Sequence, residues 1–119
     1  MTNNFLAVKV SFANEMYQIC QALGEDVDYD KVVEYAKLDP RLGNRHWAVP
    51  GPMPNSITGQ FCAGFSGSCF VKDLNSMISL SKSLNVDPKV MRAAWEKNLE
   101  VRPERDWEAL KGRAVVDDE

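Results

Sequence analysis

The sequence predicts an all-α fold, a helical bundle, on three observations. Apolar residues recur at spacings of three and four along most of the chain, which is the period of an amphipathic helix. Alternation of apolar and polar residues never extends beyond a few positions, so no strand is expected. The 119 residues are 45% hydrophobic and 26% charged, as in ordinary globular domains. We therefore expect one helical domain at residues 1–111 and an acidic tail at 112–119.

The first two helices are expected to form a hairpin. Thr2 or Asn3 can cap the first helix, and Gly24 can end it. Asp28 can cap the second helix, which ends before Pro40 because a residue that precedes proline avoids the α conformation. The apolar positions of the first helix are Phe5, Val8, Phe12, Met16, Ile19 and Leu23.

The helical period stops between Arg41 and Ser68. Prolines and glycines punctuate this segment, which is far longer than the usual connection of about 4 to 6 residues. A loop of this length in a compact domain is either functional or disordered. Three aromatic residues in it favour partial burial: Trp47, Phe61 and Phe65.

Helical spacing resumes after Cys69 and continues to Leu84, where Asn85 can end the third helix. Asp87 and Pro88 indicate the start of a fourth helix, with Asp87 as its cap and the proline in its first turn. A shorter helix is expected around 105–110.

The C-terminal part of the chain also contributes aromatic and charged side chains. Trp95 and Trp107 are expected in the core. The remaining charged residues are expected on a solvated face where they pair with one another: Arg102, Glu104, Arg105, Asp106 and Glu108.

Composition excludes several classes of function. The net charge of −3 gives no reason to expect nucleic-acid binding. No apolar run approaches the roughly 20 residues that span a membrane, and the first residues do not resemble a signal peptide. There is no GxGxxG or GxxxxGK[ST] sequence to hold a nucleotide cofactor. We expect a cytoplasmic chain that does not bind NAD by itself.

Cysteine and histidine are too few for a metal site. The three cysteines lack a CxxC spacing, and His46 is the only histidine. Cys20 and Cys62 are expected to be structural, and His46 is expected to be a surface residue of the loop.

Three runs occur in one order: NNFLAVKVSFANE at 3–15, LDPRLG at 38–43 and GSCFVKD at 67–73. Together they resemble the central, helical dimerisation domain of the UDP-glucose and GDP-mannose 6-dehydrogenases. That family carries NxFLAxKxxFxNE, DxRIG and GFGGSCFxKD. The resemblance covers residues 3–80 and extends more weakly to Asn98. It implies a bundle like the central domain of 6-phosphogluconate dehydrogenase.

The resemblance also implies a chemistry and partners. The family oxidises the C6 alcohol of a nucleotide sugar to a carboxylate by two hydride transfers to NAD, in polysaccharide biosynthesis. A cysteine holds the aldehyde as a thiohemiacetal and then as a thioester. By this resemblance the chain forms a homodimer through its first helix, binds a nucleotide sugar and depends on a separate NAD-binding chain.

The implied site residues fall on the three runs. Cys69 matches the nucleophile, and its position at a helix start favours the thiolate form. Asp73 matches the aspartate that handles protons, one helical turn further on, and Lys72 the lysine that faces oxyanions. Asn3 matches the asparagine that positions a water molecule.

The substrate contacts implied by the resemblance come from Arg41, Phe65 and Gly67. Arg41 matches an arginine that is donated across the dimer interface. Lys9, Asn14 and Glu15 are expected to make interface or capping contacts.

The sequence departs from the family pattern at several points. The family's catalytic lysine would lie upstream of Met1. Ser66 replaces a glycine, and a positive φ there would strain a serine by about 1 kcal/mol or more. The loop between Leu42 and Gly64 is longer than in the family pattern.

Three functions stay open. The chain is part of a split dehydrogenase, a non-catalytic dimerisation or nucleotide-sugar-binding module, or a truncated remnant. The KVSFANE run favours a GDP-mannose type, whereas GSCFVKD and DPRLG favour UDP-glucose.

Overall fold

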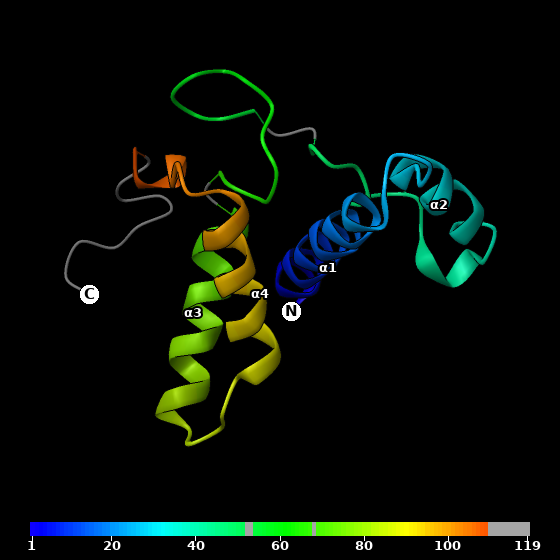
Figure 1. Cartoon of the computed structure of the whole chain (residues 1–119). Helices are drawn as coiled ribbons and strands as arrows, with labels where there is room; N and C mark the ends of the chain where they lie inside the picture. The colour runs from blue at the N-terminus through cyan, green and yellow to red at the C-terminus, as the bar shows by residue number, and fades with distance from the viewer. Residues whose placement is uncertain (52–53, 68, 110–119) are drawn as a thin grey trace.

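The computed structural model describes residues 1–51, 54–67 and 69–109. This part of the chain is all-α, as the sequence predicts (Figure 1). Its elements, in order, are α1 (Thr2–Leu23), α2 (Tyr29–Ala36), the 3-10 helix η1 (Pro40–Leu42), α3 (Cys69–Ser83), α4 (Lys89–Val101) and the 3-10 helix η2 (Asp106–Ala109). None of the helices in the described ranges is both long enough and apolar enough to cross a membrane.

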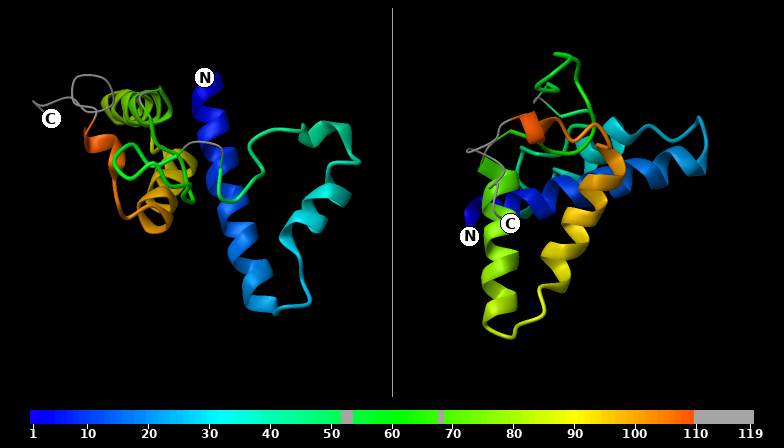
Figure 2. Two further views of the ribbon diagram at one scale, coloured as in Figure 1. Left: turned by 90° about the horizontal axis from the view of Figure 1, so that it is seen from above. Right: turned by 90° about the vertical axis from the view of Figure 1, so that its left-hand side faces the viewer.

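Helix α1 is the element on which the others are arranged. The hairpin of α3 and α4 packs on one side of α1, and α2 with η1 lies on the other side (Figure 2). Ser11 of α1 is buried and donates a hydrogen bond from Oγ to the carbonyl of Ala94 in α4, at 2.7 Å. The predicted hairpin of the first two helices is therefore present, with a second hairpin on the far side of α1.

The hydrophobic core lies where the α3–α4 hairpin meets α1 and the loop before α3. Trp95 packs on it from α4, with its ring centroid 5.2 Å from that of Trp107. Both tryptophans thus lie as the sequence predicts. The buried residues of this core are Ala7, Phe65, Val71, Leu74, Ile78 and Trp107.

The helix ends follow the sequence signals in part. The Asp28 carboxylate accepts a hydrogen bond from the Asp30 amide, so its predicted capping role is confirmed. The prediction that Thr2 or Asn3 caps α1 is wrong, because both residues lie inside the helix and Met1 precedes it. Instead of capping, Asn3 turns its side chain toward α3.

The turn between α3 and α4 is close to prediction. Asn85 has a φ of 61°, the left-handed conformation that asparagine tolerates, two residues after the end of α3. The fourth helix begins one residue later than predicted, with Pro88 at the cap position and Lys89 as the first helical residue. Asp87 instead pairs with Arg92, whose Nη2 lies 2.8 Å from its Oδ1.

The C-terminal charged run differs from its predicted solvated face. Arg102 and Asp106 are fully buried and form an ion pair, with Nε donating to Oδ1 at 2.7 Å and Nη2 to Oδ2 at 2.9 Å. The reason is that the loop before α3 folds over the end of α4 and covers them. The predicted short helix is η2, and Leu110 together with the predicted acidic tail at 112–119 lies outside the described residues.

Candidate functional site

The candidate site lies at the N-terminal ends of α1 and α3. Asn3, on the first turn of α1, donates a hydrogen bond from Nδ2 to Oδ2 of Asp73 on α3, at 2.8 Å. The two side chains are 70 residues apart in sequence. The structure therefore brings together two predicted site residues that belong to different sequence runs.

Cys69 and Lys72 belong to the same end of α3. Cys69 is the first residue of the helix and is exposed, and Asp73 follows one turn later, so both lie on the same side of α3. Lys72 is also exposed. This arrangement offers a thiol at a helix N-terminus, where backbone amides favour negative charge, with a carboxylate beside it.

The glycine-rich run takes positive φ at Gly64 and Gly67, with φ of 75° and 81°. Ser66 is not among the residues with positive φ, so the predicted strain of a serine is wrong. Ser66 is buried, and its side chain is one of the groups that lower the pKa of Asp106. The bend in this run is carried by the glycines on either side of Ser66.

Phe65 is placed in the core. Its ring is 4% exposed and packs edge-to-face on Phe70, with ring centroids 6.1 Å apart. Its backbone is also fully engaged, because Asn98 accepts from the Phe65 amide and donates to the Phe65 carbonyl. Phe65 therefore has no free polar group with which to make the predicted contact with substrate. Gly67, by contrast, is a buried turn position directly before the α3 segment.

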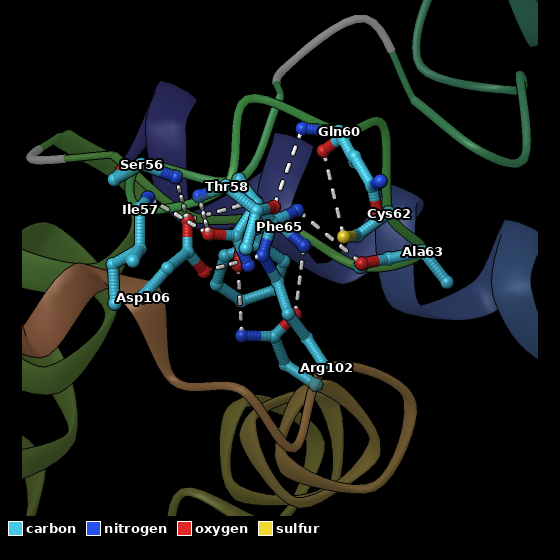
Figure 3. A network of polar contacts seen from close by, with 12 residues as sticks. Ser56, Ile57, Thr58, Gln60, Cys62, Ala63, Phe65, Arg102 and Asp106 are labelled. Carbon is cyan, nitrogen blue, oxygen red and sulfur yellow. Dashed lines mark hydrogen bonds and ion pairs between the residues drawn. The ribbon is translucent and has the colours of Figure 1, made fainter.

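A polar network from α4 and η2 holds the loop before α3 (Figure 3). Arg102 donates from Nη1 to the Ala63 carbonyl at 3.3 Å, and the Ser56 amide donates to Oδ2 of Asp106 at 2.7 Å. Burial alone would raise the pKa of Asp106. The Arg102 guanidinium and the Ser56 amide outweigh it and hold this pKa well below its usual value. The only sequence signal for this network was the spacing of four residues between Arg102 and Asp106, which suits an ion pair one helical turn apart.

Arg41 is not brought to this site within one chain. It lies on η1, on the opposite side of α1 from α3 (Figure 2). Its side chain is 87% exposed and forms a two-pronged hydrogen bond with Asp39. That contact lowers the pKa of the Asp39 carboxyl. An exposed arginine on this face can reach a neighbouring molecule.

Lys9 fixes the beginning of the long loop. Its Nζ donates to the Leu42 carbonyl at 2.6 Å and lies 5.1 Å from the centre of the Trp47 ring. Asn14 also contacts the loop, since its Oδ1 accepts from the Gly64 amide at 3.3 Å. Lys9 and Asn14 thus contact the loop, and Glu15 lies 3.8 Å from Nζ of Lys97 on α4, while the interface role of the three residues stays a prediction.

His46 lies closer to the site than the sequence suggested. Its ring is half-buried and lies 5.9 Å from that of Phe70, the neighbour of Cys69. Burial, followed by the charges of Lys9 and Arg45, lowers the pKa of this imidazole below its usual value. At neutral pH the histidine is therefore mostly uncharged.

A cleft lies between α2 and the loop at 44–51. Its lining combines aromatic and basic side chains with one carboxylate, that of Asp30. Burial is the main cause that raises the pKa of Tyr29 to about 12, and the Tyr29 hydroxyl donates to the Trp47 carbonyl at 2.5 Å. The lining includes Tyr29, Lys37, Arg45, His46, Trp47 and Phe61.

The described residues do not fit a dinucleotide or a metal. Their only β-structure is an isolated bridge between Pro54 and Phe61, so this part of the chain has no strand and glycine-rich turn to hold a pyrophosphate. Within the same ranges no three His, Cys, Asp or Glu side chains are grouped to bind a metal ion.

Comparison with known proteins gives consistent matches. The chain is 32% identical over 115 residues to UDP-glucose 6-dehydrogenase AglM of Haloferax volcanii, covering 97% of this chain and 23% of that protein. It is 36% identical over 96 residues to UDP-glucose 6-dehydrogenase TuaD of Bacillus subtilis, covering 81% of this chain and 18% of the relative. A UDP-glucose 6-dehydrogenase of Rickettsia bellii is 33% identical over 99 residues, covering 83% of this chain and 20% of that protein.

The chain thus spans about a fifth of the length of these relatives. No solved structure matches it significantly. Residues 1–100 match the model of the central domain of one protein family. That match covers most of the chain and includes Asn3, Cys69 and Asp73. The chain belongs to the UDP-glucose/GDP-mannose dehydrogenase family, as its central domain.

Proposed function

We propose that this chain is the central-domain part of an NAD-dependent oxidoreductase that converts the C6 alcohol of a nucleotide sugar to a carboxylate. The hydrogen bond between Asn3 and Asp73, beside the exposed Cys69, carries this proposal. Two separate segments there supply a nucleophile, a carboxylate and an amide at one end of a helix pair. The names of the relatives favour UDP-glucose over GDP-mannose as the substrate.

The chemistry assigned to this chain is the capture of the C6 aldehyde. The Cys69 thiolate attacks the aldehyde carbon, a sulfur–carbon bond forms, and the electron pair of the carbonyl bond moves to oxygen. That oxygen then takes up a proton and gives a thiohemiacetal. Asp73 is suited to move the proton, and Asn3 fixes the orientation of its carboxylate. The exposed Lys72 ammonium is available to anionic groups of the substrate.

The oxidation steps need a partner. Because the described residues do not fit a dinucleotide, the proposal places NAD on a separate chain that joins this one in the cytoplasm. The proposal has Arg41 of a second copy of this chain reach the site, since η1 lies on the opposite side of α1 from α3. The proposal assigns the capture of the aldehyde to the helical domain at 1–111. The basic and aromatic cleft between α2 and the loop at 44–51 supports binding of an anionic nucleotide sugar nearby.

Alkylation in the presence of a substrate aldehyde tests the covalent role. The 6-aldehyde of UDP-glucose should slow the reaction of Cys69 with iodoacetamide, and the corresponding GDP-mannose aldehyde should do so less. The rate at Cys62, resolved by peptide mass spectrometry, is the internal control. An unchanged Cys69 rate at millimolar aldehyde would overturn the covalent role.

A mixing experiment tests the split enzyme. The chain, an NAD-binding chain of this family, NAD and UDP-glucose should together produce NADH. If no NADH and no complex form, the split-enzyme proposal is overturned.

A second candidate is a non-catalytic association module. The exposed apolar face of α1, which includes Phe5, Phe12 and Ile19, favours it. In that case Cys69→Ser leaves folding, self-association and the function of the assembled complex unchanged. Loss of that function on the single substitution, with the fold intact, would exclude this candidate.

A further inference from the structure

The backbone that leads into α3 is held by side chains from other helices. Over Ala63, Gly64 and Phe65, each residue has a backbone group bound by a buried or half-buried side chain of α1 or by a buried side chain at the end of α4. We propose that Asn98, supported by the Arg102–Asp106 pair, is a positioning residue that sets the place of Cys69. This inference rests on the proposed nucleophilic role of Cys69.

Asn98 binds both backbone polar groups of Phe65, as a neighbouring β-strand would. Its Oδ1 accepts from the Phe65 amide at 2.7 Å, and its Nδ2 donates to the Phe65 carbonyl at 3.0 Å. Asn98 is fully buried, so water does not compete for either bond. A side chain that binds both polar groups of one residue fixes the orientation of that peptide as well as its position.

The fit at Gly64 shows how close this contact is. A Cβ atom on Gly64 would lie 2.5 Å from Oδ1 of Asn98, and the φ of 75° is one that glycine alone adopts easily. Asn14 approaches from α1 and accepts from the Gly64 amide. The segment is thus clamped between α1 and α4, with no room for a side chain at its bend.

The Arg102–Asp106 pair extends the clamp to the outer part of the loop. Arg102 binds the Ala63 carbonyl, and Asp106 binds the Ser56 amide, while the two side chains bind each other (Figure 3). One buried ion pair therefore joins the turn at 55–59 to the end of α4. Both of these contacts are with backbone groups of the loop, the Ala63 carbonyl and the Ser56 amide, so they constrain the path of the chain.

Two links connect this clamp to Cys69. Phe65 lies four residues before Cys69, and its ring packs on Phe70, the residue after Cys69. A shift of the Phe65 peptide therefore displaces the start of α3 from both sides. Backbone amides at a helix N-terminus stabilise negative charge, so a sulfur displaced from that position reacts more slowly as a nucleophile.

Thiol alkylation resolved by residue tests the proposal. In Asn98→Ala, iodoacetamide at fixed pH should react with Cys69 about threefold more slowly, the size expected when part of a helix-terminus interaction is lost. Cys20, which is buried in α1, should keep its rate and so report that the fold is intact. The matched control is Ser11→Ala, which removes a buried hydrogen bond between α1 and α4 but does not touch the loop. A Cys69 rate equal to that of wild type in Asn98→Ala would overturn the proposal.

Hydrogen exchange on the unmodified protein keeps the test valid if Asn98→Ala fails to fold. The amides of Gly64 and Phe65 should exchange as slowly as those in the middle of α3. Exchange at the rate of an unprotected loop would overturn the proposal. Neither measurement uses a nucleotide sugar or NAD, so a failure of the proposed enzymatic function leaves both results interpretable.

Discussion

Asn3 and Asp73 form a contact whose energy can be measured apart from catalysis. The bond is half-buried and joins an amide to a carboxylate, so its loss should cost about 1 kcal/mol. We expect Asn3→Ala to lower the unfolding free energy by this amount in urea denaturation and to weaken protection of Cys69 by the UDP-glucose 6-aldehyde. Asn75→Ala removes a hydrogen bond to the Val71 carbonyl on the same helix and is the control. If the aldehyde protects Cys69 equally in the Asn3 and Asn75 variants, Asn3 is not part of the site.

Because of Asp106, the free energy of unfolding should depend on pH in the acid range. Its pKa in the folded protein lies below the ordinary value of 3.8, so its contribution is complete at neutral pH and is lost as the pH falls below about 4. Asp106→Asn leaves Arg102 charged, buried and unpaired, which should cost about 3–5 kcal/mol at pH 7. Urea denaturation of both proteins at several pH values should show this difference shrinking toward pH 3. A difference independent of pH would contradict the ion pair.

The N-terminus of α2 illustrates how a single cap supports an element. Asp28→Ala removes the acceptor for the Asp30 amide and should destabilise the protein by about 1 kcal/mol. Thermal unfolding followed by circular dichroism measures the loss. The control is Asp26→Ala, which changes the same charge two residues before the cap. If the two variants unfold at the same temperature, the capping bond contributes nothing.

The helices were predictable from the sequence because their signals are local. The period of apolar residues, Asp28 and Asn85 each act within a few residues of the helix they define. The Asn3–Asp73 meeting was implied by resemblance alone, since no local pattern places α1 beside α3. The burial of Arg102 and Asp106 was missed for the same reason. A charged run looks solvated until the loop at 54–67, some 40 residues earlier in the chain, covers it.

An exposed apolar stripe of α1 is suited to self-association. Phe5, Phe12 and Ile19 recur every seven residues, so they share one face, and each is about half exposed or more. We expect light scattering to give the mass of a dimer for the wild-type protein and of a monomer for Phe12→Glu. Tyr35→Glu changes an aromatic residue on α2 that is 68% exposed and should leave the dimer intact. A monomeric wild-type protein would contradict the assignment of Arg41 to a second copy.

The Arg102–Asp106 pair and Trp107 lie just beyond residue 100, where the match to the family model ends. They nevertheless complete the core and hold the segment that leads to Cys69. The boundary of the family model therefore falls inside the packed core of the described residues, although the similarity to AglM continues beyond it. A protein shortened to residue 100 would keep every residue that the family model matches, yet it would lose the buried ion pair and the tryptophan that hold the loop and the core together.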